Sequence, residues 1–107
     1  GLDSSTQSLT AVIIDRAAGK IVREFSINFG KDLPHYQSPQ GFIPGGESGA
    51  VHANPLMWIE AIDLLFTRLK ETADLSTVRV IAGSGQQHGS VYLDSTFDER
   101  LASLDAG

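Results

Sequence analysis

The stretch from residue 9 to residue 29 reads LTAVIIDRAAGKIVREFSINF, and it decides the fold class. Its first part, 9–15, is a short apolar and β-branched run that predicts a strand. Residues 17–20 then supply a turn that contains glycine. In 21–29 the odd positions are apolar except Arg23, which predicts a second strand with one apolar face. The stretch therefore predicts an antiparallel β-hairpin.

The residues before this hairpin predict a third strand. If Gly1–Asp3 belongs to an earlier strand, then Ser4–Ser8 is the tip of a first hairpin. The sheet then begins as a three-stranded antiparallel meander.

A helix is predicted on the far side of a long loop. Residues 30–54 are rich in Gly, Pro, Ser, Gln and His, and a loop of this length is usually functional or mobile. Asn54 and Pro55 mark the start of the helix, because asparagine caps helices and proline suits the first turn. The pattern predicts a helix that runs to about Ala73.

The apolar residues of this helix lie at helical spacing and predict the face that packs against the sheet. They are Trp58, Ile62, Leu65 and Leu69, flanked by Ile59 and Phe66. Trp58 lies near the helix start, where its ring could also reach a ligand.

The residues after the helix predict a return to the sheet. Val78–Ala82 is a β-branched run typical of a buried strand, and a strand after a crossover helix is normally parallel to its neighbour. Ser90–Leu93 offers a further short strand. The sequence as a whole predicts an α/β fold with one core.

Composition excludes several classes of function. The 107 residues are 41% hydrophobic and 20% charged, with a net charge of −5 and no basic run, which argues against nucleic acid and anionic membrane partners. Absence of cysteine removes disulfides, thiolate metal sites and a cysteine nucleophile. No apolar stretch reaches the ~18 residues that span a bilayer. We therefore expect a soluble, cytoplasmic protein.

A start at Gly1 without methionine predicts a fragment of a longer chain.

The first candidate site is Asp3 with the hydroxyl-rich residues Ser4–Ser8. A carboxylate at a strand end can hold a hydrated Mg²⁺ ion, while backbone N–H groups and hydroxyls of a tight turn approach phosphate oxygens. An ordinary polar hairpin tip is the alternative, because Ser and Asp favour turns for local reasons.

The second candidate site is Gln86–His88, bracketed by Gly85 and Gly89. Amides and an imidazole at the end of a strand offer donors and acceptors for a polyhydroxylated ligand. A structural histidine is the alternative. The three histidines of the chain show no metal-ligand spacing, so we do not expect zinc.

Four segments, taken in order, resemble the amino-terminal part of an FGGY-family carbohydrate kinase, and within that family the xylulose kinase branch. They are GLDSSTQS at 1–8, DLPHY at 32–36, PLMWIEA at 55–61 and SGQQHGSVY at 84–92. The last segment is the one that looks like the xylulose kinase branch. Many relatives have glycine where this chain has Ser5, so a positive φ at that position would be strained.

The resemblance implies a ribonuclease H-like, actin-like domain, of which residues 1–107 are the first, incomplete part. It implies transfer of the γ-phosphate of MgATP to a hydroxyl of D-xylulose, with Mg²⁺ and ATP required. In this picture Asp3 places the Mg²⁺ through water. The residues expected to face the ATP phosphates are Ser5, Thr6, Gln7 and Ser8, and those expected to contact the sugar are Gln87 and His88.

The same resemblance places the catalytic base, an aspartate, outside this chain, so the isolated 107 residues are expected to be inactive. Another ketose such as ribulose is an alternative substrate, and a non-catalytic pentulose-binding regulatory module is an alternative function. A homodimer is kept open as an assembly of the parent protein.

Overall fold

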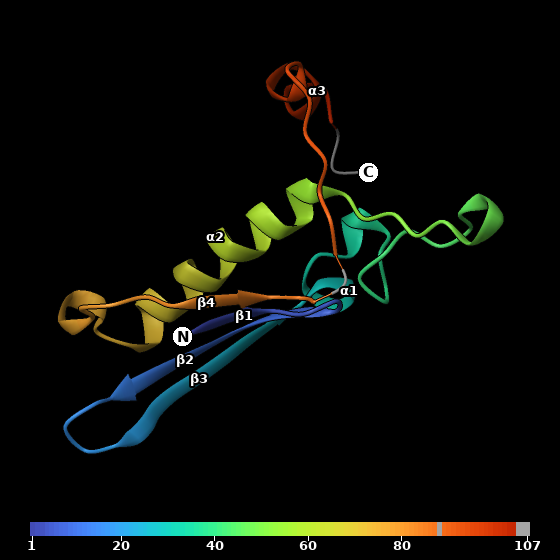
Figure 1. Cartoon of the computed structure of the whole chain (residues 1–107). Helices are drawn as coiled ribbons and strands as arrows, with labels where there is room; N and C mark the ends of the chain where they lie inside the picture. Colours follow the sequence, from blue (N-terminus) through green and yellow to red (C-terminus); the bar gives the residue numbers. More distant parts are fainter. Residues whose placement is uncertain (88, 105–107) are drawn as a thin grey trace.

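The computed structural model of the chain describes residues 1–87 and 89–104. A four-stranded mixed sheet has the order β3-β2-β1-β4, and a long helix, α2, crosses one face of it (Figure 1). The hairpin of β2 and β3 extends away from the helix at one end, and α3 stands apart from the sheet at the other (Figure 1). This arrangement gives the molecule an elongated shape of 50 × 29 × 25 Å.

The predicted hairpin is confirmed. Strand β2, Ser8–Asp15, pairs antiparallel with β3, Lys20–Asn28, with a bulge between Ile13 and Ile14. At the turn the Asp15 carboxylate accepts hydrogen bonds from the N–H groups of the residues two and three positions later. The predicted apolar face of β3 is buried only near its carboxyl end, because the opposite end of the hairpin reaches past α2.

The predicted meander is confirmed as well. Strand β1, Leu2–Ser4, is short and pairs antiparallel with β2, with Leu2 opposite Ala11. The turn between β1 and β2 is therefore the hairpin tip that the sequence predicts at this position.

Helix α2, Pro55–Thr72, begins where the sequence predicts. The side chain of Asn54 accepts a hydrogen bond from the N–H of Leu56 at 3.0 Å, so it caps the helix. The last turn closes where the N–H of Ala73 donates to the Leu69 carbonyl at 2.8 Å.

The buried stripe of α2 differs from the predicted one. It consists of Met57, Ala61, Leu65 and Leu69, whereas Ile59 and Ile62 are 50% and 42% exposed. The expectation that both isoleucines pack on the sheet is therefore wrong. The i, i+4 row of the stripe crosses the sheet directly, and the isoleucines lie to one side of it.

The core lies between α2 and the sheet and extends under the loop that follows β3. Leu9 and Ala11 come from β2, and Ile27 comes from β3. Phe29, Leu33 and Tyr36 join them from the loop, together with the buried stripe of α2.

The long loop at residues 30–54 contains short helices. These are α1, Phe29–Asp32, followed by the 3-10 helices η1, Pro34–Tyr36, and η2, Glu47–Gly49. An isolated antiparallel bridge joins Ile43 to His52 across η2. The loop is thus an ordered connection in which two segments turn back on each other.

The prediction of a buried strand at Val78–Ala82 is wrong both in the position of the strand and in the burial of the run. The strand that forms is β4, Gly83–Gly85, and Val80 and Ile81 are 81% and 62% exposed. Its direction is as predicted, because β4 runs parallel to β1 with Asp3 opposite Ser84. The preceding run approaches the sheet only at its end, where the Leu2 N–H donates to the Ala82 carbonyl at 2.8 Å.

The described residues after β4 form no further strand. Ser90–Leu93 does not form the short strand offered by the sequence, and helix α3 spans Phe97–Ser103. No helix in the described part of the chain has both the length and the apolar character needed to cross a membrane.

Candidate functional site

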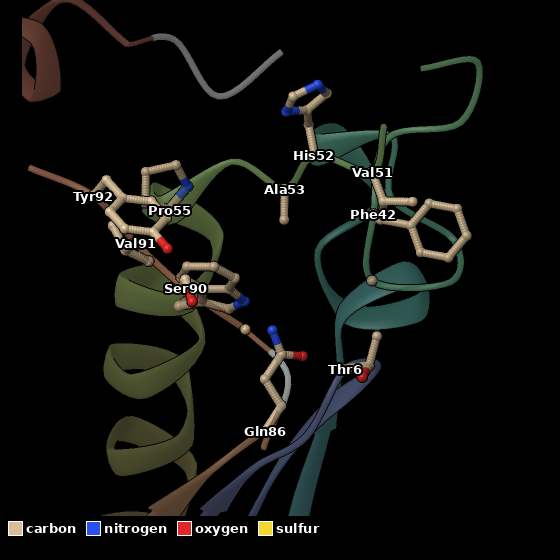
Figure 2. A pocket seen from close by; sticks show the side chains of 13 residues that line it. Thr6, Phe42, Val51, His52, Ala53, Pro55, Gln86, Ser90, Val91 and Tyr92 are labelled. Carbon is tan, nitrogen blue, oxygen red and sulfur yellow. The ribbon is translucent and has the colours of Figure 1, made fainter. Parts of the chain in front are cut away.

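A cavity of about 640 Å³ lies beyond the carboxyl ends of the parallel strands β1 and β4. Strand β1 leads into the turn that carries Thr6, and β4 leads into Gln86, and both residues line the cavity. Figure 2 shows these two side chains at one end of the cavity, reached from two neighbouring strands. This is the edge of a parallel pair at which ligands bind in open α/β sheets.

The remaining wall comes from the start of α2, the long loop and the segment after β4. Trp58 lines the cavity from α2, as the sequence suggested it could. Phe42 and Val51 lie on one side, and Tyr92 lies on the opposite side (Figure 2). None of the described lining residues is Asp, Glu, Lys or Arg. Amides, hydroxyls and aromatic rings without formal charge suit a neutral polyhydroxylated ligand.

The turn between β1 and β2 is closed by its own serines. The Ser5 N–H donates to the Ser8 carbonyl at 2.9 Å, and the Ser5 hydroxyl lies 3.1 Å from both the carbonyl and the hydroxyl of Ser8. Thr6 and Gln7 are therefore left exposed at the tip. Among the described non-glycine residues, only Gln37 and Ser48 have positive φ, so Ser5 takes its place in the turn without the strain that a positive φ would bring.

Asp3 is exposed on β1 and faces Ser84 of β4 across the parallel pair. The Ser84 hydroxyl donates a hydrogen bond to Oδ1 of Asp3. The described residues contain no group of three or more His, Cys, Asp or Glu side chains that could enclose a metal ion. A single accessible carboxylate is the donor set that fits a hydrated Mg²⁺ ion, which takes most of its ligands from water and phosphate.

The glutamine pair after β4 divides between the cavity and the surface. Gln86 lines the cavity, whereas Gln87, the predicted sugar contact, is exposed and does not line it. A Cβ at Gly89 would lie 2.3 Å from Nε2 of Gln86, so glycine makes room for this amide. His88, the other predicted sugar contact, lies outside the described residues.

Several lining residues were missed by reasoning from the sequence. Phe42, Val51 and His52 lie within the long loop, and Tyr92 lies after β4. No spacing rule links these residues to Thr6 or Gln86. The length of the loop was the one signal that pointed to the three residues within it, and no signal pointed to Tyr92 as a lining residue.

Contacts at two places hold the long loop against α2. Glu60 of α2 accepts a hydrogen bond from the Tyr36 hydroxyl at 2.7 Å, and its Oε2 lies 3.0 Å from Nε2 of His35. Nearer the start of the loop, Asp32 pairs with Arg68 of α2 at 3.0 Å. The loop that supplies part of the cavity wall is thereby tied to the helix that supplies Trp58.

The electrostatics of the first contact follow from its geometry. Hydrogen bonds from His35 and Tyr36 hold the pKa of Glu60 below its usual value. Burial, together with the Glu60 carboxylate, raises the pKa of Tyr36 to about 12. Tyr36 therefore stays a neutral donor across the physiological range.

Comparison with known proteins shows what this chain is similar to. It is 43% identical over 106 residues to a xylulose kinase of Schizosaccharomyces pombe and 40% identical over 108 residues to xylulose kinase 2 of Arabidopsis thaliana. Each alignment covers 99% of this chain and 19% of the relative. A xylulose kinase of Rattus norvegicus is 36% identical over 97% of this chain. No family model matches the chain.

The chain spans about a fifth of the length of the curated relatives it matches. Within that fifth the similarity is continuous, because almost every residue of the chain is aligned with relatives from yeast, plant and mammal. The resemblance predicted from four separate segments is confirmed: along nearly its whole length this chain is similar to the first part of proteins named xylulose kinase.

Proposed function

We propose that the chain is the first part of a kinase that transfers the γ-phosphate of MgATP to a hydroxyl of D-xylulose. One observation carries the proposal: Thr6 of the turn at residues 5–8 and Gln86, the residue after β4, line the same cavity, whose described lining contains no Asp, Glu, Lys or Arg. The phosphate-facing and sugar-facing segments inferred from the resemblance are therefore neighbours. The names of the similar proteins support xylulose as the sugar.

We also propose that these residues begin a ribonuclease H-like domain of the actin-like type, in which residues 30–54 form a long loop. An antiparallel meander followed by a crossover helix and a parallel strand beside β1 supports this assignment. The lack of cysteine is compatible with the cytoplasm, the compartment that we propose for the parent protein.

In the proposed reaction a sugar hydroxyl oxygen attacks the γ-phosphorus and the bond to the β-phosphate oxygen breaks, which releases ADP. The hydroxyl proton passes to an aspartate base that the resemblance assigns to the rest of the longer protein. Mg²⁺, when bound, neutralises charge on the phosphate oxygens. Asp3 would hold its water shell, and backbone and hydroxyl groups of residues 5–8 would orient the phosphates.

The sugar is expected to bind in the cavity. Gln86 and Trp58 supply an amide and an aromatic wall there. Gln87 and His88 remain proposed sugar contacts. Because phosphoryl transfer depends mainly on position and electrostatics, holding the sugar beside the turn is the contribution we assign to these residues.

A substrate panel on the full-length protein tests the proposal. ADP release is measured with MgATP and D-xylulose, D-ribulose, glycerol or no sugar, and the isolated 107-residue chain serves as the control expected to be inactive. Xylulose-dependent ADP release supports the proposal. A preference for ribulose would assign the protein to another ketose, and xylulose binding without turnover would identify a regulatory module.

A further inference from the structure

Gly41 makes an unusually close approach to the turn between β1 and β2. It is buried, with φ at +83°, and a Cβ built on it would lie 1.7 Å from the Thr6 carbonyl oxygen and 3.2 Å from Cα of Gln7. Both neighbouring atoms belong to the backbone, which cannot rotate away as a side chain can. Only glycine fits this contact.

The position of Gly41 is itself fixed from within the loop. Its N–H donates to the Ser38 carbonyl at 2.9 Å, which closes a tight turn. Ser38 is 1% exposed, and its hydroxyl donates to the Tyr36 carbonyl at 3.0 Å. Tyr36 is in turn held by Glu60 of α2. A continuous set of contacts therefore links α2 to the tip of the turn.

A second contact comes from the start of the same loop, where the Phe29 N–H donates to the Gln7 carbonyl at 3.0 Å. Both carbonyl groups of the tip, those of Thr6 and Gln7, thus meet the loop. The side chain of Thr6 remains exposed and lines the cavity together with Gly41.

We propose that Gly41 is a positioning residue that sets the place of the phosphate-facing turn relative to the sugar cavity. The functional part of this inference rests on the proposed kinase function, whereas the coupling between Gly41 and the turn does not. A side chain at position 41 would displace the turn, and a displacement of about 1 Å in a reacting site can lower turnover on the order of 10²-fold.

The chain offers a matched control. Gly45 has φ at +89°, close to that of Gly41, yet nothing lies within 4 Å of a Cβ built on it. Gly41→Ala and Gly45→Ala therefore impose a similar backbone strain. Only the first adds a collision with the turn.

The test compares both variants of the full-length protein. Amide hydrogen exchange of the peptide containing residues 5–8 is expected to become at least about 10-fold faster in Gly41→Ala and to stay unchanged in Gly45→Ala. In the same proteins, kcat and the KM for MgATP should change in Gly41→Ala alone. Xylulose affinity measured without nucleotide should change less than the KM for MgATP, since the Thr6 carbonyl that a Cβ at position 41 would strike belongs to the phosphate-facing turn.

Equal exchange of residues 5–8 in the two variants would overturn the inference. Faster exchange in Gly41→Ala, in a protein whose wild type phosphorylates no sugar, would retain the coupling and reject the proposed function. If Gly41→Ala does not fold, Ser38→Ala decides, because it removes the hydrogen bond from the Ser38 hydroxyl to the Tyr36 carbonyl, which links the Gly41 turn to Tyr36, without adding an atom. Unchanged exchange of residues 5–8 in that folded variant would also overturn the inference.

Discussion

Asp3 is an exposed carboxylate at the end of a strand, beside the turn assigned to the phosphates. We expect Asp3→Asn to lower turnover of the full-length protein by roughly 10²-fold, the size typical of groups that act on transition-state charge. Xylulose binding should change much less. Steady-state kinetics over a range of Mg²⁺ concentrations measure both quantities.

Asp15→Asn is the matched control for this change. Asp15 is also exposed, but it lies at the far end of β2, where it closes the turn to β3. Its replacement should leave turnover unchanged. An Asp3→Asn enzyme with normal turnover would remove Asp3 from the mechanism.

Glu60 should make part of the stability depend on pH. Its pKa is lowered in the folded state by His35 and Tyr36, so its stabilising contribution is present above the ordinary glutamate pKa and is lost as pH falls through the lowered value. Glu60→Gln should therefore lower Tm at pH 7, and the difference from wild type should shrink toward pH 3. Thermal unfolding between pH 3 and pH 8 measures this.

Glu24→Gln serves as the reference for Glu60→Gln, because Glu24 is exposed on β3. A difference in Tm that is the same at every pH would show that Glu60 acts by packing and not through its charge.

At the scale of elements, α2 stabilises the fold mainly through one buried row of side chains. Leu65 has 0% exposure, so Leu65→Ala should cost about 2–5 kcal/mol in the free energy of unfolding. Ile62 is 42% exposed, and Ile62→Ala should cost about 1 kcal/mol or less. Urea denaturation of both variants compares them. Equal losses would mean that Ile62 faces the core after all.

The elements that could be predicted from the sequence are those with local signals. The β2–β3 hairpin follows from alternation and a turn, and α2 follows from Asn54 and Pro55 at its start. The order of strands, with β4 parallel beside β1, follows from the rule for crossover helices.

The elements that could not be predicted depend on contacts across the chain. The pairing of β4 is confined to Gly83–Gly85 because β1, its partner, is a strand of three residues. Hydrophobicity alone favours Val78–Ala82, since a run of mainly apolar residues does not show which of them lie opposite a partner strand. The buried row of α2 differs from the prediction because hydrophobicity favours the larger Ile62 for the core, whereas the fold places the smaller Ala61 there.

The candidate site was predicted only in part, because some of its residues have local signals and others depend on contacts across the chain. The polar turn after a strand marks Thr6 as a candidate, and Thr6 lines the cavity, while its contact with the ATP phosphates stays a prediction. Gln86 belongs to the candidate site at residues 86–88, although the resemblance implies that the sugar contacts are Gln87 and His88. His52 and Tyr92 line the cavity only once the loop and the segment after β4 have come near the start of α2.

For the whole molecule, exposed apolar surface gathers beside an open sheet edge. Strand β4 ends the described sheet, and the run before it exposes Val80 and Ile81. An unpaired edge next to apolar side chains promotes association between chains. The isolated 107-residue chain should therefore self-associate, and sedimentation velocity over a range of concentrations measures this. Val80→Lys should weaken the association, and a monomeric wild-type profile at high concentration would contradict it.

The pairing of β1 with β4 also has a consequence for the order of folding. Asp3 and Ser84 are 81 residues apart in the sequence, whereas β2 and β3 are joined by the turn at residues 16–19. Closing so long a loop costs chain entropy before any contact compensates for it, so the parallel pair should form late and slowly. On a ribosome the hairpin would be complete long before residue 84 emerged. The cavity between Thr6 and Gln86 would therefore be among the last features of this chain to form. A ligand bound there would stabilise the contact between the segments that carry these two residues, and it could do so only late in folding.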